Sequence, residues 1–161
     1  MRAFLPFYFA LFAPCALAQS LPYADADNPS QAVGMMKANA LTSTRLLAEC
    51  SSRFPALQPE MQANHESWRA TERSNLAKTE FYWDSLTKRD PMLLDVPEFV
   101  NARVLQTIQS LDNVPVEAGP VFLADYCKQH FRDLDSGVWR ARTPRLYKFL
   151  DEATPIPAPP Q

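Results

Sequence analysis

Glycine and proline constrain the fold of this chain most strongly, because its 161 residues include three glycines and fifteen prolines. β-Sandwiches and β-barrels need many turns between alternating strands, and phosphate-binding loops need clustered glycines. Gly34, Gly119 and Gly137 are isolated, which argues against both. Many of the prolines fall where helices would begin or end. The sequence therefore predicts an all-α fold.

The apolar residues between these prolines recur at helical spacing and predict five helices. The predicted helices cover residues 29–54, 59–88, 97–112, 120–136 and 145–152. We expect a small antiparallel bundle of four main helices, followed by a short C-terminal helix, in one domain over residues 29–152. Residues 19–28 should form a flexible mature N-terminus. Residues 153–161 should form a proline-rich tail, because prolines at this density cannot continue a helix.

The first eighteen residues have the layout of a cleavable secretory signal peptide. Arg2 gives a positive start, residues 3–13 are almost entirely apolar, and the small residues Ala16 and Ala18 precede the expected cut before Gln19. The apolar run is shorter than the roughly 20 residues of a transmembrane helix. We therefore expect a periplasmic or secreted protein, with no stable membrane anchor after cleavage between Ala18 and Gln19.

Loss of the signal peptide would also decide the role of the cysteines. Cys15 leaves with it, unless it is the lipidated residue of a lipoprotein signal, which the preceding Pro14 disfavours. Cys50 and Cys127 remain, each on the apolar stripe of a predicted helix. In an oxidising compartment we expect them to form a disulfide between the first and fourth main helices.

Thiol or metal chemistry is the competing interpretation of the same cysteines. Cys127 and His130 are three residues apart, and Cys50 and His65 could be added to make a zinc set. No second close pair has metal-ligand spacing, so the sequence predicts neither a metal site nor a cofactor. Two hydrolase signatures, Gly-x-Ser-x-Gly and His-Glu-x-x-His, are also missing. An enzymatic function is therefore not expected.

One carboxylate of the long second helix falls on its apolar face. Glu72 shares that stripe with His65, Trp68 and Trp83. A buried carboxylate must be paired or must have a raised pKa. Glu72 and His65 are therefore weak candidates for an acid–base pair in an internal cleft lined by the two tryptophans. The interpretation we favour pairs Glu72 with an arginine of another helix, such as Arg45, Arg103 or Arg132.

A run of aromatic residues gives the second candidate site. Residues 81–83 cannot all point inward from one helix, so Phe81 or Tyr82 should be exposed or should contact another element. Aromatic side chains are enriched at protein interfaces, which makes Phe81 and Tyr82 the candidate interface.

Charge narrows the class of partner. The net charge is −2, or −3 once Arg2 is removed, which gives no electrostatic basis for binding nucleic acid. We therefore expect an exported, non-enzymatic helical protein of the bacterial periplasm that binds a protein partner, in an inhibitor, immunity-like or envelope-accessory role. The alternative is a small periplasmic enzyme or ligand carrier that uses Glu72 and His65 in an internal cleft.

Overall fold

The computed structural model describes residues 25–113 and 119–152, and within these ranges it contains seven α-helices, two short 3-10 helices and no β-strand. The prediction of an all-α domain is confirmed. The signal peptide, residues 19–24 and the tail from residue 153 onward lie outside the described residues. The α-helices are α1 (Pro29–Arg53), α2 (Gln58–Thr71), α3 (Arg73–Arg89), α4 (Val96–Asp112), α5 (Gly119–Asp135), α6 (Val138–Arg142) and α7 (Pro144–Glu152). The 3-10 helices are η1 (Pro55–Leu57) and η2 (Pro91–Asp95).

Five of the seven α-helices start at a proline or one residue before one, as predicted. Asn28 is the N-cap of α1, and its side chain accepts a hydrogen bond from the backbone N–H of Gln31 at 2.9 Å. Pro29 occupies the first turn, where its missing N–H would have had no partner in the helix. The end of α5 is also set by a nearby residue. Gly137 follows this helix with a φ of 75°, the left-handed conformation that commonly ends helices.

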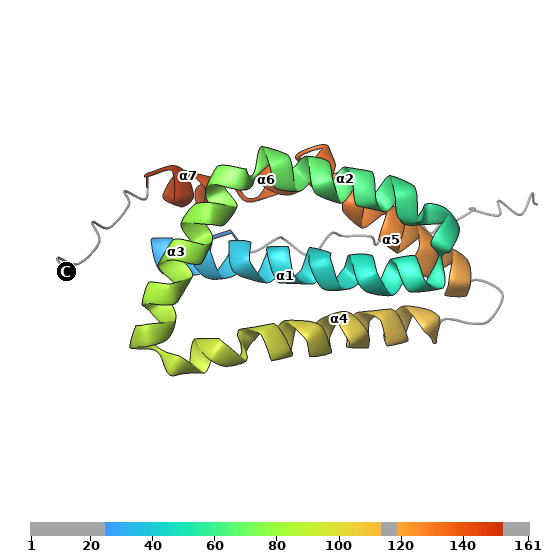
Figure 1. The fold of residues 1–161 in the computed structure, drawn as a ribbon, viewed down its shortest axis with the longest axis horizontal. Helices are drawn as coiled ribbons and strands as arrows, with labels where there is room; N and C mark the ends of the chain where they lie inside the picture. Colours follow the sequence, from blue (N-terminus) through green and yellow to red (C-terminus); the bar gives the residue numbers. More distant parts are fainter. Residues whose placement is uncertain (1–24, 114–118, 153–161) are drawn as a thin grey trace, which may run out of the picture.

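The single helix predicted for residues 59–88 is wrong, because two helices, α2 and α3, occupy this stretch. Glu72 lies between them with φ −91° and ψ 9°, outside the helical region. α3 then leaves the line of α2 at a steep angle (Figure 1). Neither glycine nor proline lies at this junction, so the apolar periodicity runs through it without a break. The short helix α6 was also missed, because five residues carry no readable period.

The longest helix, α1, is central to the arrangement. In Figure 1, α2 and α4 lie on opposite sides of α1, and α3 crosses near its start. α5 packs against both α2 and α4, while α7 packs against α1. An ion pair between Arg53 and Asp112 joins the C-terminal ends of α1 and α4, which therefore run in the same direction and not antiparallel as predicted. The crossing of α3 makes this possible, since it carries the chain from α2 to the start of α4.

The core is built from side chains of all the long helices. Its fully buried members include Met36, Leu46, Met61, Ile108, Leu123, Phe131, Leu146 and Leu150. Each fully buried aliphatic or aromatic side chain contributes roughly 1.5–3 kcal/mol relative to an exposed one. Helices α1, α2, α4, α5 and α7 are thus joined by one continuous apolar cluster.

The predicted cysteine pair is confirmed. The sulfur atoms of Cys50 on α1 and Cys127 on α5 lie at bonding distance, 2.01 Å, with their Cα atoms 6.0 Å apart. The cysteines are 77 residues apart in sequence. Closing such a loop stabilises a domain by about 4 kcal/mol in the chain-entropy model.

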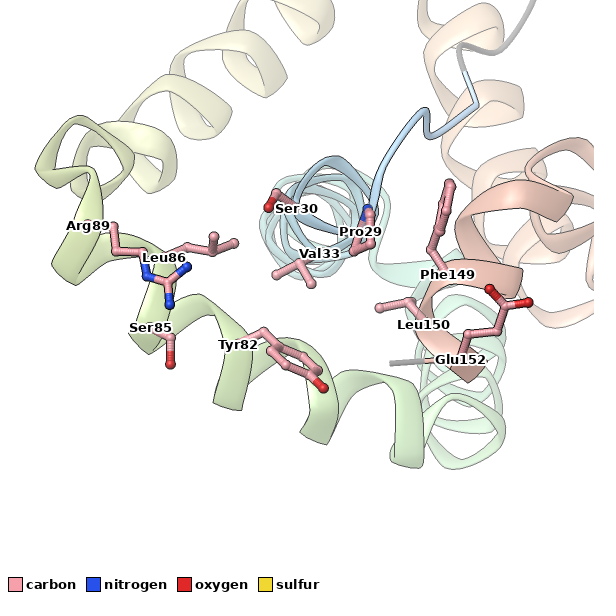
Figure 2. Close-up of a pocket in the computed structure, with 10 residues that line it drawn as sticks. All are labelled: Pro29, Ser30, Val33, Tyr82, Ser85, Leu86, Arg89, Phe149, Leu150 and Glu152. Carbon is pink, nitrogen blue, oxygen red and sulfur yellow. The ribbon is translucent and has the colours of Figure 1, made fainter. Parts of the chain in front are cut away.

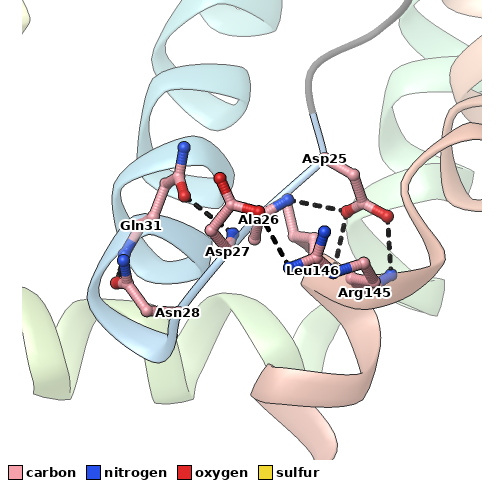
Figure 3. A network of polar contacts seen from close by, with 7 residues as sticks. All are labelled: Asp25, Ala26, Asp27, Asn28, Gln31, Arg145 and Leu146. Atoms are coloured by element: carbon pink, nitrogen blue, oxygen red, sulfur yellow. Dashed lines mark hydrogen bonds and ion pairs between the residues drawn. The ribbon is translucent and has the colours of Figure 1, made fainter.

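The residues before α1 differ from the prediction of a flexible N-terminus. Residues 25–28 are instead in contact with the rest of the domain, and the side chain of Ala26 is fully buried. Figure 3 shows the carboxylate of Asp25 at the start of α7, where it accepts hydrogen bonds from the backbone N–H groups of Arg145 and Leu146 at 2.8 and 2.9 Å. These contacts join the start of the described chain to its last helix.

Candidate functional site

Glu72, the first candidate from the sequence, lies at the bend between α2 and α3 and is only 2% exposed. One carboxylate oxygen accepts a hydrogen bond from the Tyr147 hydroxyl at 3.1 Å, and the other accepts one from the Asn75 amide at 2.9 Å. Arg140 completes the set, with its Nε 3.4 Å from the first oxygen. The buried charge is therefore paired and hydrogen bonded, as burial requires.

The arginine that pairs with Glu72 was not among the predicted ones. Arg45 instead pairs with Glu49, and Arg132 pairs with Glu60. Arg103 donates a hydrogen bond to the side chain of Gln106. The partner is Arg140, which lies on α6. Arg140 was not considered because α6 was not predicted from the sequence.

Tyr147 links this charged pair to α7. Its ring lies under the guanidinium of Arg140, with 4.2 Å between the guanidinium carbon and the ring centroid. The ring of Trp139 packs edge-on against it at 5.8 Å. Burial, followed by the negative charge of Glu72, raises the pKa of Tyr147 well above its usual value. The hydroxyl therefore remains protonated and serves as a donor to Glu72.

His65 lies on α2 in different surroundings. It stacks on Trp68 at 5.8 Å and meets the edge of Phe131 at 5.9 Å. Burial, followed by the charge of Arg69, lowers the pKa of His65 below its ordinary value. His65 is thus a neutral packing residue at pH 7, and its ring contacts involve none of the partners of Glu72. The geometry gives Glu72 and His65 structural roles and does not bring them together as an acid–base pair.

Phe81 and Tyr82, the candidate interface, lie on α3. Phe81 is exposed and packs against the half-buried Tyr82 at 5.6 Å between ring centroids. At least one of the two is therefore exposed, as expected. Tyr82 also lines a cavity that could not be located from the sequence.

That cavity, the α1–α3–α7 pocket, has a volume of about 300 Å³. Figure 2 shows the side chains of Val33, Leu86 and Leu150 converging from the three helices toward its centre. Arg89 and Glu152 lie on opposite sides of it. The interior is thus apolar, and both charges lie at its rim.

A larger apolar cavity, the α1–α3–α4 groove, opens on the other side of α3. It has a volume of about 600 Å³. Its apolar lining consists of Met35, Ala38, Trp83, Leu86, Leu93, Val96, Phe99 and Val100. Ser30, Leu86 and Arg89 line both the groove and the α1–α3–α7 pocket, so the two cavities flank one contact between α1 and α3. Neither is lined by Glu72 or His65.

Exposed apolar side chains extend this region along the chain. Met92, Leu94 and Phe99, on η2 and the start of α4, are 79%, 65% and 64% exposed. Single exposed apolar residues are ordinary, but several next to an apolar groove are typical of a binding surface. We name Met92, Leu94, Phe99 and the groove together the α3 surface; Phe81 lies on α3 but lines neither cavity. Met92, Leu94 and Phe99 were not predicted; the apolar run at residues 92–94 signals Met92 and Leu94, and Phe99 has no comparable local signal.

Neither a Ser–Lys catalytic pair nor a metal site is supported by the described residues. Ser85 lines the α1–α3–α7 pocket and lies three residues before Lys88, which is the spacing of a Ser-x-x-Lys motif. Lys88 is exposed and does not line that pocket. No group of three or more histidine, cysteine, aspartate or glutamate side chains suited to a metal ion occurs within residues 25–113 and 119–152.

Within residues 25–113 and 119–152, no helix combines the length and apolar character needed to cross a membrane.

Comparison with known proteins adds no assignment. The chain matches no protein-family description, no curated protein and no solved structure.

Proposed function

We propose that this protein is an exported, non-enzymatic domain that binds a protein partner through the α3 surface. The single observation that carries the proposal is the apolar α1–α3–α4 groove, with Met92, Leu94 and Phe99 exposed beside it or at its edge. Clusters of this kind are costly to leave in water and mark interaction sites.

The shape and chemistry of the groove favour an amphipathic helix as the part of the partner that binds. Three helices and η2 bound an apolar floor, the arrangement that accepts the apolar face of a helix. Arg89 lies at the rim and makes no ion pair or hydrogen bond with any residue in the described ranges. An acidic residue flanking the apolar face of the partner helix would pair with it.

The rest of the domain would act as a rigid support for this surface. We propose that α1, α2, α4 and α5 form a four-helix bundle that the Cys50–Cys127 disulfide ties together. A disulfide of this kind is expected in a periplasmic or secreted protein and supports the signal peptide proposed for residues 1–18. The inhibitor, immunity-like and envelope-accessory roles are all compatible with such a support.

The proposal is tested by photo-crosslinking in the native host. A photoreactive amino acid is placed at residue 99 and, as a matched control, at Phe122, an aromatic residue of α5 that is 53% exposed. We expect one discrete adduct from position 99 and none from position 122. Phe99→Ser in a chain crosslinked from residue 92 should abolish the adduct, whereas Phe122→Ser should leave it unchanged. Equal adducts at both positions, or none at position 99, would contradict the proposal.

A further inference from the structure

A separate cavity, the α1–α5 pocket, lies on the side of α1 that faces α5, and the proposed partner site does not include it. Its volume is about 390 Å³, within the range of small-molecule sites and large enough for roughly ten water molecules. Apart from Leu134, its lining residues are polar or aromatic. They are Asn39, Thr42, Tyr126, Gln129, His130, Asp133 and Trp139.

Two of these side chains have a buried nitrogen without a partner. Neither Asn39 Nδ2 nor His130 Nε2 has a hydrogen-bond partner among the described residues. A buried polar group left in this state costs about 1–3 kcal/mol, so native proteins seldom retain one without a reason. Here α1 and α5 each place one beside the same cavity. The χ2 torsions of asparagine and histidine are soft, and a rotation about them turns a covered nitrogen toward a bound molecule.

The charges around the cavity favour a neutral ligand. No lysine or arginine lines it, and Asp133 is its one carboxylate. Burial is the largest cause that lowers the pKa of His130, to about 4, so the imidazole is neutral at pH 7. The Asn39 amide needs an acceptor, Asp133 accepts one hydrogen bond from Gln129 at 2.5 Å and has lone pairs left for further donors, and a neutral imidazole takes either role. A ligand that bears several hydroxyl groups meets all three needs, because each hydroxyl both donates and accepts.

The aromatic residues supply the apolar part of the site. Tyr126 and Trp139 line the same cavity from α5 and α6. The ring of Trp139 is held by its edge-on contact with Tyr147 at 5.8 Å. Aromatic faces carry partial negative charge and pack well against the C–H groups of a ring-shaped polyol.

We propose that the α1–α5 pocket binds a neutral polyhydroxylated molecule of monosaccharide size. Asn39, His130 and Asp133 would hold its hydroxyl groups, and Tyr126 and Trp139 would pack on its C–H faces. This site is independent of the α3 surface, so either proposal can fail alone.

The test follows the amide and indole N–H signals of the ¹⁵N-labelled domain by NMR during titration with D-glucose and with myo-inositol. We expect saturable shifts of the Trp139 indole and the side-chain amides of Asn39 and Gln129 with at least one polyol. Asn39→Leu and Asp133→Asn should each weaken binding about tenfold, the loss of one hydrogen bond. Asn101→Leu, which changes an exposed asparagine of α4, is the matched control and should bind as the parent does.

Three outcomes would overturn the proposal. The first is no shift with either polyol at concentrations of tens of millimolar. The second is undiminished binding by both pocket variants. The third is binding of choline chloride without binding of the polyols, which would identify the aromatic pair and Asp133 as a cation site. Asp133 is half-exposed, and asparagine has nearly the same shape as aspartate, so Asp133→Asn should fold. This variant therefore tests the proposal even if Asn39→Leu fails to fold.

Discussion

The carboxylate of Asp25 accepts a hydrogen bond from the backbone N–H of Arg145 at 2.8 Å, across 120 positions of the sequence. A second bond, from the N–H of Leu146, makes Asp25 a capping residue for α7 that is supplied from the other end of the chain. Helix starts are normally capped by a residue directly before the helix. Here the N-terminal segment and α7 depend on each other.

The cap can be tested by removing it. Asp25→Ala should lower the free energy of unfolding by about 1 kcal/mol, the usual cost of losing a side-chain cap. Asp27, which forms an exposed ion pair with Arg145, is the matched control, and Asp27→Ala should cost less than about 0.5 kcal/mol. Urea denaturation followed by circular dichroism measures both. Equal losses would mean that charge near Arg145, rather than the cap, stabilises α7.

The disulfide should contribute strongly to the free energy of unfolding. Reduction of the Cys50–Cys127 bond should lower the free energy of unfolding by about 4 kcal/mol, because the unfolded chain regains the entropy of an open loop. Urea titrations with and without reductant measure the loss. The double variant Cys50→Ala and Cys127→Ala should behave like the reduced protein and should not respond to reductant. A reductant effect below 1 kcal/mol in the parent would contradict this expectation.

The Glu72 network should show coupling between its members. Tyr147→Phe removes the hydroxyl that donates to Glu72 and leaves a buried acceptor short of one bond, so it should cost about 1–3 kcal/mol. Arg140→Gln should cost at least as much, about 3 kcal/mol, because it leaves the buried carboxylate of Glu72 without its counter-charge. A double-mutant cycle of Glu72→Gln with Tyr147→Phe measures the coupling by urea denaturation. Additive losses in that cycle would show that the 3.1 Å contact contributes nothing.

Acid should destabilise the domain between about pH 6.5 and pH 4. The pKa of His130 falls from 6.5 in the unfolded chain to about 4 in the folded one, chiefly because of burial. The unfolded state therefore binds more protons in this window, and stability is complete above pH 6.5 and falls as the pH drops. The loss at pH 4 from this residue is up to about 3 kcal/mol. The lowered pKa of His65 acts in the same direction.

Urea titrations across this range, on the parent and on His130→Gln, measure the effect. The variant should lose most of the slope while keeping its stability above pH 7 within about 1–2 kcal/mol. An unchanged slope in His130→Gln would remove His130 as the cause.

Asp25 contributes to the pH dependence at lower pH. Burial raises the pKa of Asp25, but the hydrogen bonds from the N–H groups of Arg145, Leu146 and Ala26 outweigh burial. The pKa of Asp25 therefore lies below its ordinary value, and its contribution to stability is lost only under stronger acid.

Local chemistry in the sequence was sufficient for the fold class and for most helix boundaries. A proline has a fixed φ and no N–H, so Pro29, Pro97 and Pro144 mark helix starts whatever surrounds them. Apolar spacing likewise placed Cys50 and Cys127 on inward-facing stripes, and two cysteines allow one intramolecular pairing. These inferences depend on neighbouring residues alone.

Tertiary structure decided the rest, because it depends on residues that are distant in sequence. The bend at Glu72 has no local signal, and its partners Arg140 and Tyr147 come from helices some 70 residues later. The cavities beside α3 and α5 exist because of how helices cross, which the apolar period of a single helix does not encode. Local sequence was enough to predict the helix starts marked by prolines and the link between α1 and α5, but not the starts of α3 and α6. Their packing decided which polar groups are paired, which remain without partners, and where apolar surface stays open to a ligand or partner.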